Sequence, residues 1–368
     1  MAFTPHRRLG AALLARGVGI GLGVLADRSI ADPQHHHPVA AFGSAADRLE
    51  KWVWEDSVTC GGLYTAACLL PLGVLGAAAD RATRDHPVAR VIVTAAATWA
   101  VVGATSLARE GDTMASRLAA EDLEGARDQL SHLCGRDPSS LDEPELARAT
   151  VESMAENTAD AAVASIFWGA VGGLPAMLIH RGANTLDAMV GHHNERFERF
   201  GKISAHLDDL LDLAPARITG VLACMLAPMV GGDLRRSLSV LARDHAHHPS
   251  PNGGWCESAW AGALGVTLGG RNLYYGSREE NRPLLGNGPR PDADKVRDAA
   301  RLVQAVTFAA TGIAVSGVAA AGHLLFYGGI LPRPAGTLGD RDTKGARRTR
   351  RSLRAALRTT THPTEAHQ

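Results

Sequence analysis

Three carboxylates recur at helical spacing in the segment ESMAENTAD. If this segment is helical, Glu152, Glu156 and Asp160 lie on one face at i, i+4 and i+8, with Asn157 beside them. Carboxylates that repel one another in this way can share a divalent cation such as Mg²⁺ with substrate phosphates. The alternative is a solvated helix face whose basic partners lie elsewhere in the chain.

A second acidic stretch follows the next apolar segment and is interleaved with arginines. Its polar residues include Asn184, Asp187, Asp208 and Asp209. Acids suit a cation, and the planar fork of arginine suits phosphate oxygens, so this mixture indicates a metal and phosphate site. Arg217 stands at the edge of an apolar segment, where we expect it to bind an anionic ligand or to pair with Asp209 or Asp212.

Two loops combine turn residues with polar side chains. The first, SPNGGWCE, contains Ser250, Asn252, Gly254 and Glu257, and its glycines permit a ligand to approach the backbone closely. A simple glycine-rich turn before a helix is the alternative. The second loop contains Asp32 and three consecutive histidines, residues 35–37, but adjacent histidines seldom aim at one ion, so zinc is disfavoured.

Several function classes are disfavoured by composition and motifs. The 368 residues carry 38 basic and 38 acidic side chains, so overall charge gives no argument for a nucleic-acid partner. The five cysteines are scattered without a CxxC pair, which argues against a zinc site or a disulfide framework. No GxxxxGK[ST] or GxGxxG motif is present, so any nucleotide must bind by other means.

The elements that must position these residues are apolar helices of membrane-crossing length. Small residues dominate all of them, which favours close helix packing. The charges Arg16 and Arg217 leave two stretches open to an interfacial or re-entrant interpretation, so we expect four to six spans. The six stretches are Leu9–Ala26, Cys60–Ala79, Val88–Ala108, Ala161–Ile179, Leu213–Gly231 and Leu302–Ile330.

The sequence therefore predicts an all-α, multi-pass helical membrane protein with polar helical and loop insertions. The insertions are an amphipathic connector after Arg109, a helix capped by Ser140 or Asp142, and loops with a short helix near Glu257 to Leu268. No alternating strand pattern of useful length appears. We expect an integral membrane domain over residues 1–332 and a basic, disordered tail over residues 333–368.

Taken together, five long motifs over about residues 20–330 resemble the CobD/CbiB family of cobalamin biosynthesis proteins. The motifs are DRSIADPQHHHPVAAFG, ESMAENTAD, FWGAVGGLPAMLIHRGANTLDAMVG, FGKISAHLDDLLDLAPAR and SPNGGWCESAWAGALGVTLGG. The resemblance implies a ligase of the cell membrane that joins adenosylcobyric acid to (R)-1-aminopropan-2-ol or its O-phosphate, giving adenosylcobinamide or its phosphate. It also implies ATP and Mg²⁺ as cofactors, an acyl phosphate attacked by the amine, and association with other cobalamin-assembly enzymes.

The resemblance implies a role for each candidate residue. Mg²⁺ would be bound by Glu152, Glu156 and Asp160, and the last two would also take part in catalysis. Asp187 or Asp208 would bind metal or deprotonate the amine. The substrates would be bound by Asp32, Asn157, Asn184, Arg217, Ser250, Asn252, Gly254 and Glu257.

Two positions depart from the family pattern, since His206 replaces the usual arginine and Asp212 replaces the usual asparagine. Replacement of a permanent cation by a histidine predicts weaker or pH-dependent phosphate binding. Two other functions stay open. A small-molecule transporter also builds sites from acids and amides at helix interruptions, and a non-catalytic scaffold of a corrinoid-assembly complex would bind without turnover.

Overall fold

The computed structural model describes residues 5–30, 37–274 and 278–327. The described residues up to Phe326 form one compact unit. Asp32 and the expected tail, residues 333–368, lie outside the described residues, as does the predicted domain boundary at residue 332.

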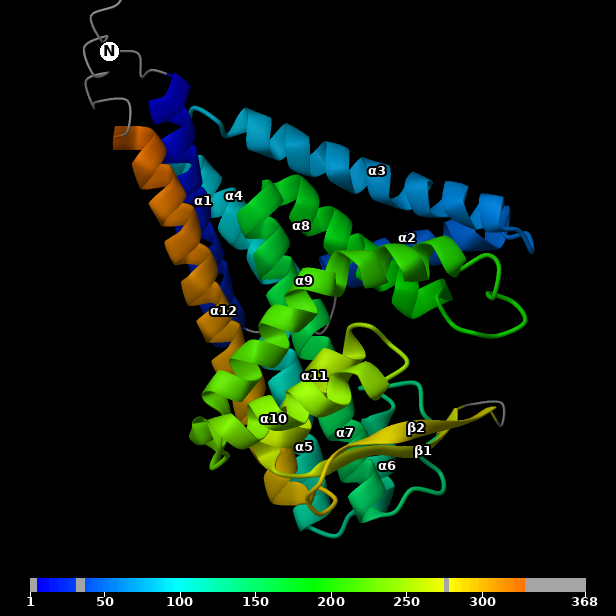
Figure 1. Cartoon of the computed structure of the whole chain (residues 1–368). Coiled ribbons are helices and arrows are strands. Elements are labelled where there is room, and N and C mark those ends of the chain that lie inside the picture. Colours follow the sequence, from blue (N-terminus) through cyan, green and yellow to red (C-terminus); the bar gives the residue numbers. More distant parts are fainter. Residues whose placement is uncertain (1–4, 31–36, 275–277, 328–368) are drawn as a thin grey trace, which may run out of the picture. The chain divides into compact units, whose positions relative to one another are not determined.

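The described residues are mostly helical, which confirms the predicted all-α class (Figure 1). A π-helical turn, η1, covers Ala159–Val163, and two short 3₁₀ turns cover Ala227–Val230 and His245–His247. The helices are α1 (Pro5–Ile30), α2 (Pro38–Val53), α3 (Val58–Ala82), α4 (Pro87–Val101), α5 (Ala104–Ala119), α6 (Leu123–Leu130), α7 (Glu143–Thr158), α8 (Ala164–Val190), α9 (Lys202–Leu226), α10 (Leu234–Asp244), α11 (Gly253–Leu264) and α12 (Ala293–Tyr327).

Six helical segments of the described residues are long and apolar enough to cross a membrane, and each overlaps one of the six predicted stretches. Small residues let two of them pack closely. A Cβ atom built on Gly19 or Gly23 of α1 would lie within 2.6 Å of the Cβ of Thr94 or Thr98 of α4. Glycine is therefore required where α1 crosses α4, as expected for helices that associate in lipid.

The predicted fourth span is interrupted. Gly173 has φ 71° and ψ −157°, so α8 changes direction there (Figure 1). Arg16 of α1 binds at this break, where its guanidinium lies 3.9 Å from Asp80, and Asp80 also pairs with Arg90 at 3.3 Å. Arg16, which left open whether the first apolar stretch spans the membrane, is thus paired with an acid. The helix α1 continues through Arg16 without interruption.

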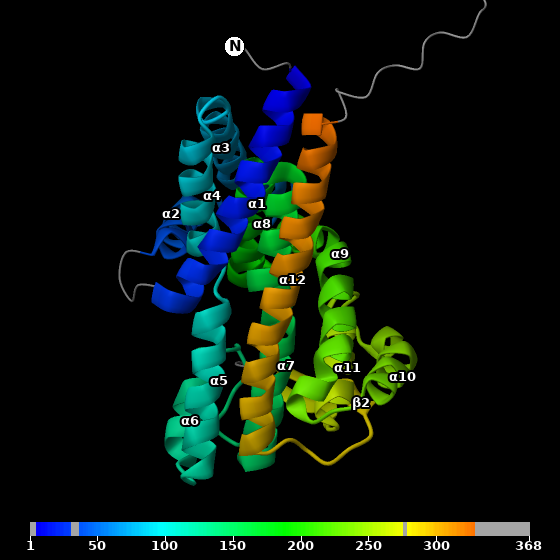
Figure 2. The same ribbon diagram turned by 90° about the vertical axis from the view of Figure 1, so that its left-hand side faces the viewer.

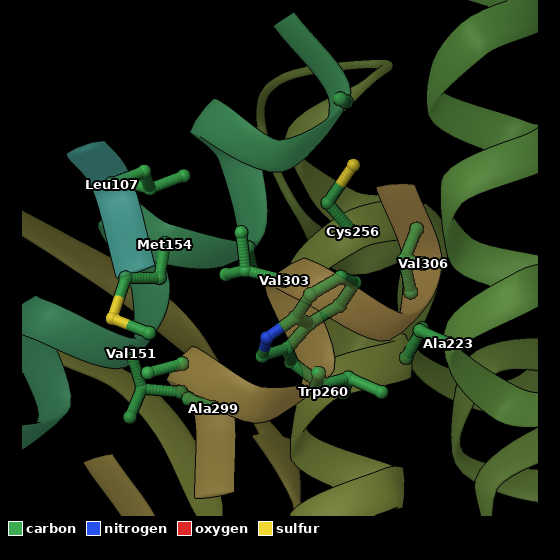
Figure 3. Packing of buried hydrophobic residues seen from close by; sticks show 14 of the residues in the cluster. Leu107, Val151, Met154, Ala223, Cys256, Trp260, Ala299, Val303 and Val306 are labelled. Atoms are coloured by element: carbon green, nitrogen blue, oxygen red, sulfur yellow. The ribbon is translucent and has the colours of Figure 1, made fainter. Parts of the chain in front are cut away.

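The long helix α12 links the apolar helices to the polar insertions (Figure 2). Near its C-terminal end it packs on α1, where Gly10 and Gly322 are in close contact. Near its N-terminal end the side chain of Gln304 donates to the carbonyl of Ala104 in α5 at 3.2 Å. The core around Trp260, which is fully buried, joins α5, α7, α9, α11 and α12 (Figure 3).

A β-hairpin was missed by the sequence analysis. Strands β1 (Thr267–Tyr274) and β2 (Arg278–Gly286) pair antiparallel, with an irregularity between Leu268 and Gly270. The prediction that no strand is present was wrong, because Gly269 and Gly270 break the alternation of side chains and adopt positive φ at a bulge. The short helix predicted near Glu257 to Leu268 is present as α11. It begins earlier, at Gly253, and ends at Leu264, before the hairpin.

Candidate functional site

Six carboxylates from four helical segments converge on one cavity of about 170 Å³. Such a concentration of acids in so small a volume is unfavourable unless protons, cations or donors compensate it. The cavity is lined by Glu156, Asp160, Asp187, Asp208, Asp209, Asp212, Ser250, Asn252, Gly253 and Cys256. Four of these residues, Glu156, Asp160, Asp187 and Asp208, are the predicted catalytic carboxylates, so the structure brings all of them together.

The π-helical turn between α7 and α8 positions one of these acids. Asp160 lies in this turn and Glu156 lies in the last turn of α7. A π-helical turn adds a residue to the helical repeat, and such turns are frequent at functional sites. It changes the face that the helix presents after Glu156, and both carboxylates line the cavity.

Two carboxylates of α9 are the most deeply buried of the six. Asp208 and Asp212 are 8% and 2% exposed, and Asp212 accepts from His180 Nε2 at 2.8 Å. One oxygen of Asp208 is buried without a hydrogen-bond partner among the described residues, although Asn184 contacts this carboxyl group. The potential ligand atoms of His180, Asp208 and Asp212 lie within 4.8 Å of one another.

The predicted SPNGGW loop forms the wall opposite α9. Ser250 Oγ accepts from the backbone N–H groups of Asn252 and Gly253 at 3.3 and 3.0 Å, which fixes the first turn of α11. The Asn252 amide donates to the Asp209 carbonyl at 2.8 Å. A Cβ on Gly253 would come within 2.5 Å of Glu156 Oε1, and one on Gly254 would collide with the His245 carbonyl. Both glycines are therefore needed for close packing.

Arg217 of α9 contacts this wall and forms no ion pair with any described residue. Its guanidinium donates to Asn252 Oδ1 at 3.2 Å and to the Leu213 carbonyl at 2.7 Å, and it lies 5.2 Å from the centre of the Trp255 ring. Among the described residues it makes no salt bridge with Asp209 or Asp212, so that alternative was wrong. The guanidinium keeps donors for an anionic ligand next to the cavity.

Glu152 requires a correction, because it points away from the cavity. It is fully buried between Arg136, at 2.5 Å, and Arg148, at 3.0 Å, and it accepts from the backbone N–H of Gly269 at 2.7 Å. Its charge is compensated by two guanidinium groups, which leave no place for a cation. Glu152 attaches α7 to the β-hairpin and so positions Glu156, one turn later.

Glu257 lies behind the cavity in a second buried network. It contacts His248 at 3.3 Å and Arg282 of β2 at 3.2 Å. Burial opposes the charged imidazole, but the hydrogen bond and charge of Glu257 outweigh it and raise the pKa of His248. Ligand atoms of Glu156, His248 and Glu257 lie within 4.8 Å of one another, so this network supports Glu156 from behind.

The remaining predicted positions have different surroundings. Asn157 donates to Ser153 in its own helix and does not line the cavity. The departure His206 is exposed, whereas the departure Asp212 lines the cavity. Cys256 lines the cavity too, but burial and nearby carboxylates raise the pKa of its thiol well above the ordinary value, which keeps the thiol protonated.

Sequence reasoning missed four contributors to the site: His180, His248, Cys256 and Arg282. Of these, His180 was open to detection, because an ionisable residue within the apolar run PAMLIHRG is costly without a partner. The contacts of His248 and Arg282 depend on the hairpin, which the sequence did not indicate.

Comparison with known proteins agrees with the motifs. The CobD/Cbib protein family matches residues 20–303. The Cobalamin biosynthesis protein CobD of Mycobacterium tuberculosis is 45% identical over 301 residues, covering 82% of this chain and 95% of the relative. Its namesake in Geobacter metallireducens is 41% identical over 288 residues, covering 76% and 90%. No solved structure matches the chain. Because the family match extends over most of the chain, the protein belongs to the CobD/CbiB family of cobalamin biosynthesis proteins.

Proposed function

We propose that this protein is an ATP-dependent ligase that joins adenosylcobyric acid to (R)-1-aminopropan-2-ol or its O-phosphate. The observation that carries the proposal is the convergence of six carboxylates on one cavity beside Arg217 and the first turn of α11. A carboxylate does not condense with an amine unaided in water. The reaction needs activation of the acid and deprotonation of the amine.

The cavity fits a divalent cation. Its donors are carboxylate oxygens, which Mg²⁺ prefers, and the buried Asp208 has an oxygen without a partner among the described residues. Glu156, Asp160 and Asp208 would bind the cation, while His180 fixes the orientation of Asp212 from behind. When bound, Mg²⁺ would neutralise phosphate charge and polarise the transferred phosphoryl group.

The N-terminal turn of α11 and Arg217 form the phosphate-binding side of the proposed site. The positive end of the α11 helix dipole favours an anion, and the Arg217 guanidinium adds a permanent positive charge beside Asn252. They would hold the phosphates of ATP so that the corrinoid carboxylate oxygen attacks the γ-phosphorus. The bond between the β,γ-bridging oxygen and the γ-phosphorus breaks, ADP leaves, and an acyl phosphate is formed.

Asp187 would bind and deprotonate the amine substrate. It lies in the last turn of α8 and is partly accessible at the cavity, so it can attract the ammonium form of the aminoalcohol and accept its proton. The neutral amine then attacks the acyl carbon and the C–N bond forms. The bond between the acyl carbon and the bridging oxygen breaks, and inorganic phosphate leaves with that oxygen. One ATP is converted to ADP and phosphate for each amide formed.

The test is to incubate detergent-solubilised protein with adenosylcobyric acid, ATP, Mg²⁺ and either aminoalcohol, and to identify products by mass spectrometry. A ligase gives the amide and an equal amount of ADP, and the preferred amine identifies the second substrate. Asp187→Asn serves as the matched variant, because it keeps the side-chain size but removes the proton acceptor. Corrinoid binding without ADP or amide from well-folded protein would contradict the proposal and favour a carrier or a scaffold.

A further inference from the structure

A second cleft, separate from the acidic cavity, gathers positive charge from three helices. It has a volume of about 420 Å³ and shares no lining residue with the cavity. Arg28 of α1, Arg109 of α5 and Arg301 of α12 line it, against one acid, Asp112. The cleft is therefore an electropositive site that the proposed ligase reaction does not use.

Two of the three arginines lack an acidic partner. Arg301 pairs with Asp298 at 3.1 Å, but its side chain stays 65% exposed. Arg28 and Arg109 form no ion pair with any described residue, and both are exposed at the cleft. Asp112 and Asp298 offset only part of the positive charge of the three guanidinium groups, which repel one another, so an anionic ligand would stabilise this arrangement.

Each arginine also stands at the end of an uncharged run of its helical segment. Residues 17–26 precede Asp27 and Arg28, residues 91–108 precede Arg109, and residues 302–322 follow Arg301 without an acid, lysine or arginine. These runs lie in three of the segments that are long and apolar enough to cross a membrane. The arginines thus mark one boundary between the apolar and polar parts of these helices, where lipid headgroups are found.

The rest of the cleft is apolar and open. Phe308 of α12 is 40% exposed and Met229 is 67% exposed, and both line the cleft with Ala108 and Ala305. A free phosphate or a sugar is not stabilised by contact with apolar side chains, whereas an acyl chain is stabilised when these surfaces remove it from water. The combination of three cations and an apolar wall fits a molecule with an anionic head and a hydrocarbon tail.

We propose that the cleft between α1, α5 and α12 binds an anionic phospholipid, with its phosphate on Arg28, Arg109 and Arg301 and its acyl chain against Phe308 and Met229. This ligand is independent of the ligase reaction. The lipid would hold α1, α5 and α12 together at the point where the apolar helices meet the polar insertions.

The experiment is native mass spectrometry of the full chain in detergent, with phosphatidylglycerol or phosphatidylcholine of identical acyl chains added. The wild type is compared with Arg28→Gln/Arg109→Gln. The matched control is Arg81→Gln/Arg235→Gln, which removes two exposed arginines that lie outside the cleft and form no ion pair with described residues. Thermal unfolding of each variant in lipid-free detergent establishes that it is folded.

The wild type should retain phosphatidylglycerol in preference to phosphatidylcholine. Near a surface one arginine changes affinity for an anionic lipid by about fivefold, so the cleft variant, which lacks two, should lose about 25-fold and the control far less. Equal binding of the two lipids, or equal losses in both double variants, would overturn the proposal. Complete displacement of phosphatidylglycerol by ATP or inorganic phosphate would also overturn it, because the cleft would then recognise a free phosphate.

Discussion

Replacing Glu152 with glutamine should lower the free energy of unfolding by about 3–5 kcal/mol, whereas the same change at Glu156, one turn away, should not lower it. Glu152 is fully buried and holds Arg136 at 2.5 Å and Arg148 at 3.0 Å, both of which are almost fully buried themselves. An amide leaves the Arg136 guanidinium without an acidic partner and leaves Arg148 paired with Glu145 alone. Removal of one partner from a buried ion pair has this cost.

Glu156 has the opposite environment, because it faces the acidic cavity and lies near Glu257. Its amide variant relieves repulsion between carboxylates, so we expect an unchanged or higher unfolding free energy together with loss of ligase activity. The assay is unfolding of each purified variant in mixed micelles of increasing SDS content, followed by tryptophan fluorescence, with product formation measured in parallel. A Glu152→Gln variant as stable as the wild type would refute the structural role of Glu152. A Glu156→Gln variant with full activity would refute the division of roles between the two acids.

Three further predictions concern the cavity wall. Asp208→Asn should abolish product formation yet raise the unfolding midpoint measured in EDTA, because it removes one of several mutually repelling charges; a lower midpoint would contradict this. Arg217→Lys keeps the charge but loses the planar guanidinium that donates to Asn252 and stacks on Trp255. The KM for ATP should therefore rise about tenfold. Unchanged kinetics would show that Arg217 is not a phosphate ligand. Cys256→Ser should keep most of the activity, and the native wild type should resist iodoacetamide at this thiol at pH 8, because burial keeps it protonated; rapid modification there would refute the buried, protonated state.

The apolar helices and the main acids of the site were predictable for the same physical reason. Apolar runs of membrane-crossing length are rare in soluble domains, and all six appear within long helical segments. Acids next to such runs are costly unless they have a function, and Asp160, Asp187 and Asp208 do meet in one cavity. Local patterns were sufficient for these conclusions, because the free-energy cost of an acid beside an apolar run and the periodicity of a helix both depend on residues that are close in the sequence.

Pairing was not predictable, because it depends on contacts between distant segments. Glu152 and Glu156 lie one turn apart on the same predicted helix face. Arg136 and the β-hairpin nevertheless bind Glu152, whereas Glu156 lies at the cavity. The i, i+4 pair of Arg148 with Glu152 was a visible signal for a structural role. The hairpin itself was hidden, since Gly269 and Gly270 interrupt the alternation by which a strand is identified.

The most direct test of the catalytic cavity is the Mg²⁺-dependent rate of amide formation by the wild type and by Asp160→Asn, prepared and assayed together. Asp160 lies in the π-helical turn, and its carboxylate faces the cavity. Our account predicts that the variant unfolds like the wild type or at higher SDS, and that its rate falls by about a hundredfold or more at saturating Mg²⁺. Full activity of Asp160→Asn would contradict the assignment of this cavity as the site of cation-assisted ligation.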